Sequence, residues 1–351
     1  MDKEKIITYI ENSFIKDILL DNDITDITYN GKYLYIQKNT TGRSRSGLKV
    51  TNNEVKDFLR QISNMAEKQF NYLYPLVDIN VGRYRINMTN SSVARRGDEE
   101  VYNFAIRLAS LTPKITYGSG FLCDELEGLF DLLISNKISI IISGLPGVGK
   151  TEFQKYLMSK IEEDSRVIVI DSTIELMYIS NVDKLDISYW KIDENNPLAS
   201  VSSLVKNGLR NNPDWMIISE ARGSEMSDVL TSLMTGIPLI TTIHSFDAFT
   251  SSNRLAKMVM MNEKKMDYED VINNINDHLK IYVHLSKIVK KNEPIIRYIS
   301  SIVEVDELGK KHEIFSDNLK SKKFAKLSKN FLDHLLINNK DKRVRRFISH
   351  E

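Results

Sequence analysis

Hydrophobic residues follow two different periods in the first part of the chain. Within 1–20 they recur at helical spacing, which predicts an amphipathic first helix; they are Ile6, Ile7, Ile10, Phe14 and Ile18. Apolar and polar residues then alternate on both sides of Asn30-Gly31, a dipeptide that strongly favours a β-hairpin. The chain is therefore predicted to begin with a helix followed by two paired strands.

A mixture of helix and strand patterns continues up to about residue 110. A second helix is predicted across 52–70, with Asn52 or Asn53 as its N-cap. The segments VDINVGRYRINMTN and VYNFAIRLAS predict a further pair of strands, separated by the polar stretch SSVARRGDE. We expect these elements to form an N-terminal α+β domain over 1–110.

The pattern changes after a segment that begins LTPKITYGSG, whose proline and glycines predict a linker over 111–122. Short apolar runs then alternate with helical patterns, which is typical of a mostly parallel sheet and places the chain in the α/β class. The predicted strands are 138–143, 166–171, 215–219, 239–244, 279–285 and 295–305, and the predicted helices are 123–134, 149–164, 197–210, 223–235 and 247–260. We assign this second domain to 123–309.

The last segment, 310–351, is basic. It holds twelve Lys or Arg against five Asp or Glu, whereas the whole chain has a formal net charge of only +1, so residues 1–309 are net acidic. Helical spacing of four apolar residues predicts that at least part of this tail is an amphipathic helix: Phe324, Leu327, Phe331 and Leu335. Three roles stay open for it: a solvated helix packed on the body, a docking surface for a membrane-complex partner, or contact of KDKRVRRF (340–347) with nucleic acid or anionic lipid.

Composition limits the class of protein. The 351 residues contain one cysteine, Cys123, which excludes an intramolecular disulfide and a multi-cysteine zinc site and predicts a small buried side chain. The acidic start MDKEKIITYIENSF does not resemble a signal peptide, and no apolar run approaches the roughly 18 residues that span a bilayer. We expect a cytoplasmic protein, peripheral at the membrane through its partners.

Residues 144–151, GLPGVGKT, match the phosphate-loop pattern G-x-x-x-x-G-K-[ST] between a predicted strand and a predicted helix. Glycines allow the backbone amides to converge on an anion at the start of the helix. In such a loop the lysine contacts the β- and γ-phosphates and the following hydroxyl binds Mg²⁺. We therefore predict that ATP binds to Gly144, Leu145, Pro146, Gly147, Val148, Gly149, Lys150 and Thr151.

Hydrolysis also requires an acid near the terminal phosphate, placed at the end of a neighbouring strand. Glu220 directly follows the apolar run WMIIS, and Glu175 lies four residues after Asp171 at the end of RVIVID. Either side chain could act as the catalytic acid, or form a surface ion pair or a helix cap. Glu220 is also a candidate Mg²⁺ ligand beside Thr151, directly or through water.

Four segments together resemble the traffic ATPases of type II and type IV secretion systems and pilus motors. GLPGVGKT is similar to their Walker A motif, IDSTIEL to the aspartate box, LRNNPDWMIISEARGSE to the atypical Walker B motif, and MTGIPLITTIHSFDAFTSSNRL to the histidine box. LLDNDITDITYNGKYLYI is similar to the start of the family's N-terminal domain. The resemblance covers about 15–305 and leaves the basic tail out.

The resemblance implies a RecA-like second domain, a ring of six subunits, and ATP between the two domains. By it, Glu220 activates water with help from Glu175, and His244 senses the γ-phosphate. Three arginines, Arg83, Arg85 and Arg107, are candidates for neutralising charge in the transition state, within a subunit or across the ring. Arg210, Arg222 and Arg254 lie in matching segments and are weaker candidates.

The chain also departs from the family pattern. Ile237 stands where many relatives have histidine, Leu239 where they have glycine, and Phe246 where asparagine is frequent. The zinc-binding cysteines of the type II branch are absent, which favours the type IV or tight-adherence pilus branch.

These patterns favour an ATP-driven motor whose ring opens and closes as ATP is hydrolysed. Its expected partners are further copies of the chain and inner-membrane secretion or pilus components, with DNA or protein cargo handled indirectly. A RecA-like ATPase that contacts DNA directly is the alternative, and a small-molecule kinase is a third possibility for which no acceptor-site motif is visible. Cargo and direction of transport stay open.

Overall fold

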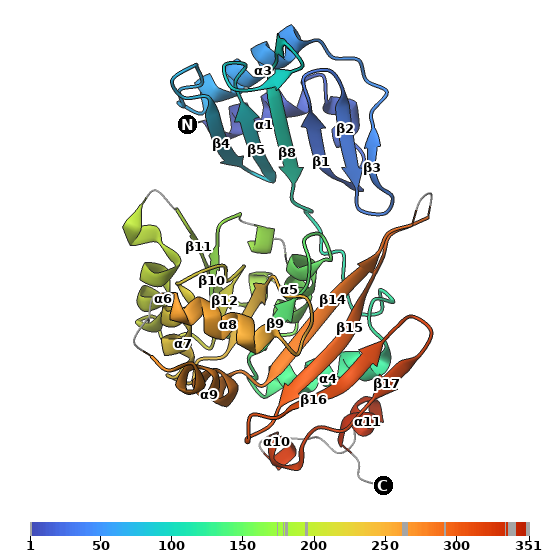
Figure 1. Ribbon diagram of the computed structural model, residues 1–351, viewed down its shortest axis with the longest axis vertical. Coiled ribbons are helices and arrows are strands. Elements are labelled where there is room, and N and C mark those ends of the chain that lie inside the picture. The colour runs from blue at the N-terminus through green and yellow to red at the C-terminus, as the bar shows by residue number, and fades with distance from the viewer. Residues whose placement is uncertain are drawn as a thin grey trace. The chain divides into compact units, whose positions relative to one another are not determined.

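The computed structural model describes residues 2–173, 175–177, 179, 182–193, 196–261, 266–290, 293–333, 335 and 342–348. The chain forms two compact units (Figure 1). Unit 1 comprises Met1–Leu111 and Ile288–Ile296, and unit 2 comprises Thr112–Lys287 and Arg297–Glu351.

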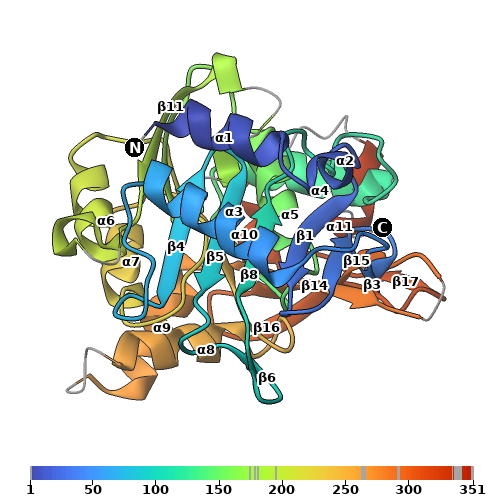
Figure 2. The ribbon, with the colours of Figure 1, turned by 90° about the horizontal axis from the view of Figure 1, so that it is seen from above.

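Unit 1 is an antiparallel sheet covered on one face by helices. The strands, in the spatial order β3-β2-β1-β8-β5-β4, are β1 (Ile24–Tyr29), β2 (Leu34–Lys38), β3 (Gly42–Arg45), β4 (Leu76–Val81), β5 (Tyr84–Thr89) and β8 (Asn103–Leu108). Helices α1 (Lys3–Glu11) and α3 (Asn52–Met65) lie across the sheet (Figure 1, Figure 2) and share one buried apolar cluster with it. The predicted α+β N-terminal domain and the β1–β2 hairpin are confirmed.

Three details of unit 1 differ from the sequence prediction. The first helix is split into α1 and α2 (Lys16–Leu19). The cap of α3 is Thr51, whose hydroxyl accepts the Glu54 amide while the Glu54 carboxylate accepts the Thr51 amide. The segment VDINVGRYRINMTN forms two strands, because Gly82 adopts a positive φ of 50° and turns the chain between β4 and β5.

Unit 2 contains a nine-stranded sheet between two layers of helices, and the first six strands in its spatial order are parallel. In spatial order the nine strands are β11 (Asp186–Lys191), β10 (Arg166–Asp171), β12 (Trp215–Ile218), β13 (Leu239–Ile243), β9 (Ile140–Ser143), β14 (Ile281–Ile288), β15 (Ile296–Val305), β16 (Lys311–Asp317) and β17 (Lys322–Phe324). The helices are α4 (Asp124–Ser135), α5 (Lys150–Met158), α6 (Val201–Leu209), α7 (Met226–Leu233), α8 (Ser251–Met260) and α9 (Tyr268–His278). The predicted mostly parallel α/β domain is confirmed, although α9 and β11 were not predicted.

Alternating side chains of the strands bury both faces of this sheet. Ile140 and Ile142 of β9 pack in the cluster that includes α4 and α5, whereas Ile141 packs in the cluster that includes α6, α7, α8 and α9. A strand buried on both faces appears in the sequence as a continuous apolar run, which is why these strands were predictable. Cys123, predicted to be buried, is half-buried beside the first cluster.

The basic tail is helical only in part. Its first segment forms β16 and β17, which extend the sheet, and the described part of the remainder contains the short helices α10 (Lys329–Asp333) and α11 (Arg345–Ile348) and a 3₁₀ turn at Lys342–Val344. The predicted helix that included Phe324 is wrong there, because Phe324 lies in β17, where its ring packs edge-on against Phe347. Phe347 is fully buried and Arg343 forms an ion pair with Asp131 at 2.9 Å. Residues 340 and 341 of the basic run KDKRVRRF lie outside the described residues.

No helix among the described residues is both long and apolar enough to cross a bilayer.

Candidate nucleotide-binding site

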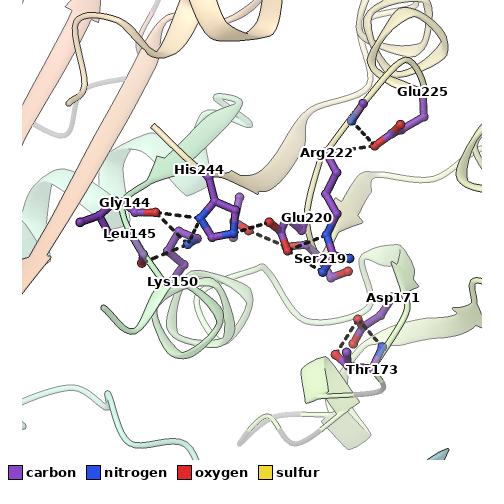
Figure 3. Close-up of polar contacts among 12 residues, drawn as sticks. Gly144, Leu145, Lys150, Asp171, Thr173, Ser219, Glu220, Arg222, Glu225 and His244 are labelled. Atoms are coloured by element: carbon purple, nitrogen blue, oxygen red, sulfur yellow. Dashed lines mark hydrogen bonds and ion pairs between the residues drawn. The ribbon is translucent and has the colours of Figure 1, made fainter. Parts of the chain in front are cut away.

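The candidate residues of unit 2 follow four neighbouring parallel strands. The loop 144–151 follows β9, His244 follows β13, Glu220 follows β12, and Glu175 follows β10. Parallel strands present their carboxyl ends at one edge of a sheet, and ligands of open α/β sheets bind outside this edge. The fold therefore brings together residues that are far apart in sequence, such as Gly144 and His244, which are 100 positions apart (Figure 3).

The loop itself has the backbone of an anion cradle. Gly144, Gly147 and Gly149 all have positive φ, and Gly149 is the residue before the first turn of α5. A Cβ added to Gly144 would lie 2.6 Å from the Leu285 carbonyl oxygen of β14, so only glycine fits this position. Amides that point inward at the start of a helix attract phosphate.

Substitution of Gly144 tests this geometry. We expect Gly144→Ala to lower the free energy of unfolding by more than about 1 kcal/mol, because alanine both resists the positive φ of 148° and collides with β14. Chemical denaturation measures this effect. Gly47→Ala is the control, since a Cβ at Gly47 meets nothing within 4 Å, and it should leave stability nearly unchanged. Equal stability of the two variants would contradict the described loop.

Lys150 is the buried cation of the loop, with only 9% of its surface exposed. Its Nζ donates to the carbonyl oxygens of Gly144 at 2.9 Å and Leu145 at 3.3 Å and lies 3.2 Å from His244 Nδ1 (Figure 3). Burial lowers the pKa of Lys150 to about 8, although the negative charge of Glu220 acts in the opposite direction. A buried cation with a depressed pKa is one that an anionic ligand would stabilise.

Glu220 lies between His244, which contacts this lysine, and Arg222. Its Oε1 lies 2.8 Å from His244 Nε2, and its Oε2 accepts from Arg222 Nη2 at 2.8 Å and Nε at 2.9 Å. The chain Lys150–His244–Glu220–Arg222 is therefore continuous (Figure 3). The loop after Glu220 is fixed in turn by Glu225, whose carboxylate accepts the amides of Arg222 and Gly223. Arg222 thus contacts Glu220 directly, which the sequence did not predict.

The turn after β10 is organised by Asp171. Its carboxylate accepts the amide and hydroxyl of Thr173 at 3.0 and 3.1 Å and the amide of Leu176 at 3.3 Å. Glu175 begins the 3₁₀ turn Glu175–Met177 and is half-buried. Its proposed role as a second catalytic acid stays a prediction.

The donor set suits a magnesium nucleotide. The loop offers amides and one ammonium group for phosphate oxygens, while Thr151 at the start of α5 and Glu220 offer the oxygen ligands that Mg²⁺ prefers. A Cβ at Gly147 would lie 3.0 Å from Lys287 Nζ, so glycine at this position leaves room for the ammonium group beside the loop.

Three polar residues near the loop were not predicted. Lys287 of β14 and Arg297 of β15 donate to loop carbonyls, from Nζ to Pro146 at 2.9 Å and from Nε to Gly147 at 3.1 Å. Gln154 of α5 is fully buried, and its amide donates to the carbonyls of Ile218 at the end of β12 and Ile240 in β13, which ties the helix to two strands. In the sequence, the basic character of the segment SKIVKKNEPIIR is the only sign of Lys287 and Arg297.

The candidate arginines of the N-terminal domain all lie in unit 1. Arg85 and Arg107 are paired across β5 and β8 and are exposed, and Arg107 Nε lies 3.3 Å from Asp26. Arg83 lies in the β4–β5 turn with its guanidinium 5.2 Å from the Tyr84 ring. In unit 2, Arg210 and Arg254 are exposed at the end of α6 and on α8. Their proposed roles toward the nucleotide stay predictions.

The sequence model of the Type II/IV secretion system protein family matches residues 110–311, more than half of the chain. The chain belongs to this family. The matched segment contains all four motifs described above, and the resemblance inferred from them is confirmed.

Several known proteins and solved structures also resemble this chain. An uncharacterized protein of Bacillus anthracis is 27% identical over 89% of this chain and 73% of its own length. The type IV secretion system protein VirB11 of Bartonella henselae is 31% identical, over 37% of each chain. The X-ray structure of the Legionella pneumophila ATPase DotB has a TM-score of 0.64 at 16% identity and covers 84% of this chain and 80% of DotB.

A second structural neighbour was solved with a bound nucleotide. The pilus retraction motor PilT with bound ADP has a TM-score of 0.58 at 17% identity, over 81% of this chain and 80% of PilT. At such identities the likeness concerns the fold, which this member of the secretion family shares with both proteins.

Proposed function

We propose that this protein hydrolyses ATP with Mg²⁺ and that a ring of subunits, most simply six, converts hydrolysis into domain motion in a type IV secretion, conjugation or related pilus machine. The observation that carries the proposal is the continuous chain from Lys150 through His244 to Glu220 beside a glycine-rich loop. Family membership and the named relatives support the class of machine.

Each residue has a distinct part in the proposed reaction. Amides of 144–151 and Lys150 bind the phosphates, and Thr151 holds Mg²⁺, with Glu220 beside it directly or through water. Bound Mg²⁺ neutralises negative charge on the phosphate oxygens. Glu220 orients the attacking water and accepts its proton, and His244, which contacts both Glu220 and Lys150, senses the state of the γ-phosphate.

A measurement of products and mass tests this proposal. Purified protein should release free phosphate from MgATP, whereas a phosphorylated metabolite as product would indicate a kinase instead. In the presence of a non-hydrolysable ATP analogue, the solution mass should approach six times the 40.4 kDa of one chain. A monomer with and without the analogue would contradict the ring. Strong stimulation by single-stranded DNA with steep salt dependence would favour the alternative of a DNA-dependent ATPase.

Nucleotide affinity should depend on pH through Lys150. Its pKa is lowered to about 8 by burial, whereas bound polyphosphate favours the charged form, so binding is coupled to protonation of this lysine. We expect affinity for the magnesium nucleotide to fall about tenfold between pH 7 and pH 9. Equilibrium titration at several pH values measures the fall.

The matched variant is Lys150→Arg, whose guanidinium stays charged over this range, so its weaker binding should be nearly independent of pH. Equal affinity of the wild type at pH 7 and pH 9 would show that Lys150 does not titrate in this way.

We further propose that the partners are inner-membrane secretion or pilus components, that the protein works at the cytoplasmic face of the membrane, and that cargo DNA or protein is handled through these partners. Burial of Phe347 and the Arg343–Asp131 ion pair support the interpretation that the described end of the tail packs on unit 2.

A further inference from the structure

Two cations from one strand pair donate hydrogen bonds to carbonyl oxygens of the phosphate loop. Lys287, near the end of β14, donates from Nζ to the Pro146 carbonyl oxygen at 2.9 Å. Arg297, near the start of the adjacent strand β15, donates from Nε to the Gly147 carbonyl oxygen at 3.1 Å. Both residues belong to unit 2, as does the loop.

These contacts fix the direction in which the loop peptides point. A peptide group that directs its N–H toward an anion directs its carbonyl away from it. Glycines leave the loop many alternative conformations, including peptide flips that would turn carbonyl oxygens toward the phosphate. Hydrogen bonds from charged donors are about twice as strong as neutral ones, so two of them on consecutive carbonyls favour one arrangement.

The positive charges around the loop also favour the binding of an anion. Burial and the neighbouring charge of Arg297 lower the pKa of Lys287, and the charge of Lys287 contributes in turn to the lowered pKa of Lys150. Three cations thus lie close enough to repel one another. A polyanion bound in the loop would relieve this repulsion.

We propose that Lys287 and Arg297 are positioning residues of the phosphate loop: they hold the Pro146 and Gly147 carbonyls outward so that the following amides face the phosphates, and they add positive charge beside them. The inference rests on the proposed function, in that the ligand is a nucleoside di- or triphosphate. The β14–β15 strand pair, which lies outside all four sequence motifs, thereby has a role in the phosphate loop.

Substitutions that remove each cation but keep the aliphatic stem test the proposal. Lys287→Met and Arg297→Met should each weaken binding of magnesium with a fluorescent ADP analogue about tenfold, and more when combined. The KM for ATP should rise in parallel, with a much smaller fall in kcat, because Lys150, Glu220 and His244 are retained. Lys287→Arg should restore most of the affinity. Lys323→Met, at an exposed position of β17, is the matched control and should bind like the wild type.

Hydrogen exchange in the absence of nucleotide measures positioning directly. Backbone amides of 144–151 should exchange faster in Lys287→Met and Arg297→Met than in the wild type or Lys323→Met, whereas a purely electrostatic or remote structural role would not single out these amides. Wild-type affinity together with unchanged exchange in both variants would overturn the positioning role and leave the proposed function intact. Failure of the wild type itself to bind the ADP analogue would instead overturn the proposed function.

Discussion

Lys150→Ala is expected to abolish ATP turnover and to weaken nucleotide binding by about two orders of magnitude or more. Charged hydrogen bonds to phosphate contribute about 1.5–3 kcal/mol each, and this side chain is placed to make more than one of them. The fold should persist, because burial already lowers the pKa of Lys150 to about 8 and a neutral side chain avoids the cost of a buried charge.

Phosphate release and nucleotide titration measure these effects, and thermal unfolding verifies the fold. Lys206→Ala is the control, since Lys206 is an exposed lysine of α6 that pairs with Asp228 in the same unit. Comparable turnover by Lys150→Ala and the wild type would remove the loop from the reaction.

Glu220→Gln should separate binding from hydrolysis. Glutamine keeps the shape of the side chain and can still hydrogen-bond Arg222 and His244, but it cannot accept a proton from water. Loss of a positioned general base typically lowers the rate by about 10²–10⁴-fold, whereas nucleotide affinity should stay within a few-fold of the wild type. Single-turnover hydrolysis and equilibrium binding measure the two effects.

Glu175→Gln is the matched comparison, because it makes the same change in the other candidate acid. We expect it to lower the rate less than Glu220→Gln does, since Glu220 is the acid joined to Lys150 through His244. A normal rate for Glu220→Gln with a large loss in Glu175→Gln would reverse the assignment of the two carboxylates.

The sequence predicted those parts of the site that local chemistry determines. The loop 144–151 is recognisable because a glycine turn, a lysine and a hydroxyl must be contiguous in the chain. Glu220 was also accessible, because it directly follows an apolar strand and parallel strands end at one edge, whereas His244 was named only through the resemblance to the histidine box.

Residues that act through strand neighbours could not be predicted. Lys287 and Arg297 reach the loop because β14 pairs with β9 and β15 lies beside β14, and no spacing along the chain encodes this order. Arg222 was considered a weak candidate, because its contact with Glu220 depends on the turn that Glu225 fixes.

The fold could be predicted in segments where the hydrophobic residues follow a single spacing. Continuous apolar runs identified the central strands, whereas the tail was misjudged because the apolar residues of β17, α10 and the segments between them coincide with helical spacing. Thr51 was missed as the cap of α3 because the neighbouring asparagines are equally good caps in isolation, and only the reciprocal contact with Glu54 decides between them.

Binding of a triphosphate by residues 144–151 is tested most directly by equilibrium titration of the purified protein with a magnesium nucleotide. Calorimetric titration with a non-hydrolysable ATP analogue and Mg²⁺ should show saturable binding that Lys150→Ala removes and Lys206→Ala retains. Absence of binding by the wild type at every protein concentration, including those at which it assembles, would contradict the claim that residues 144–151 hold a triphosphate.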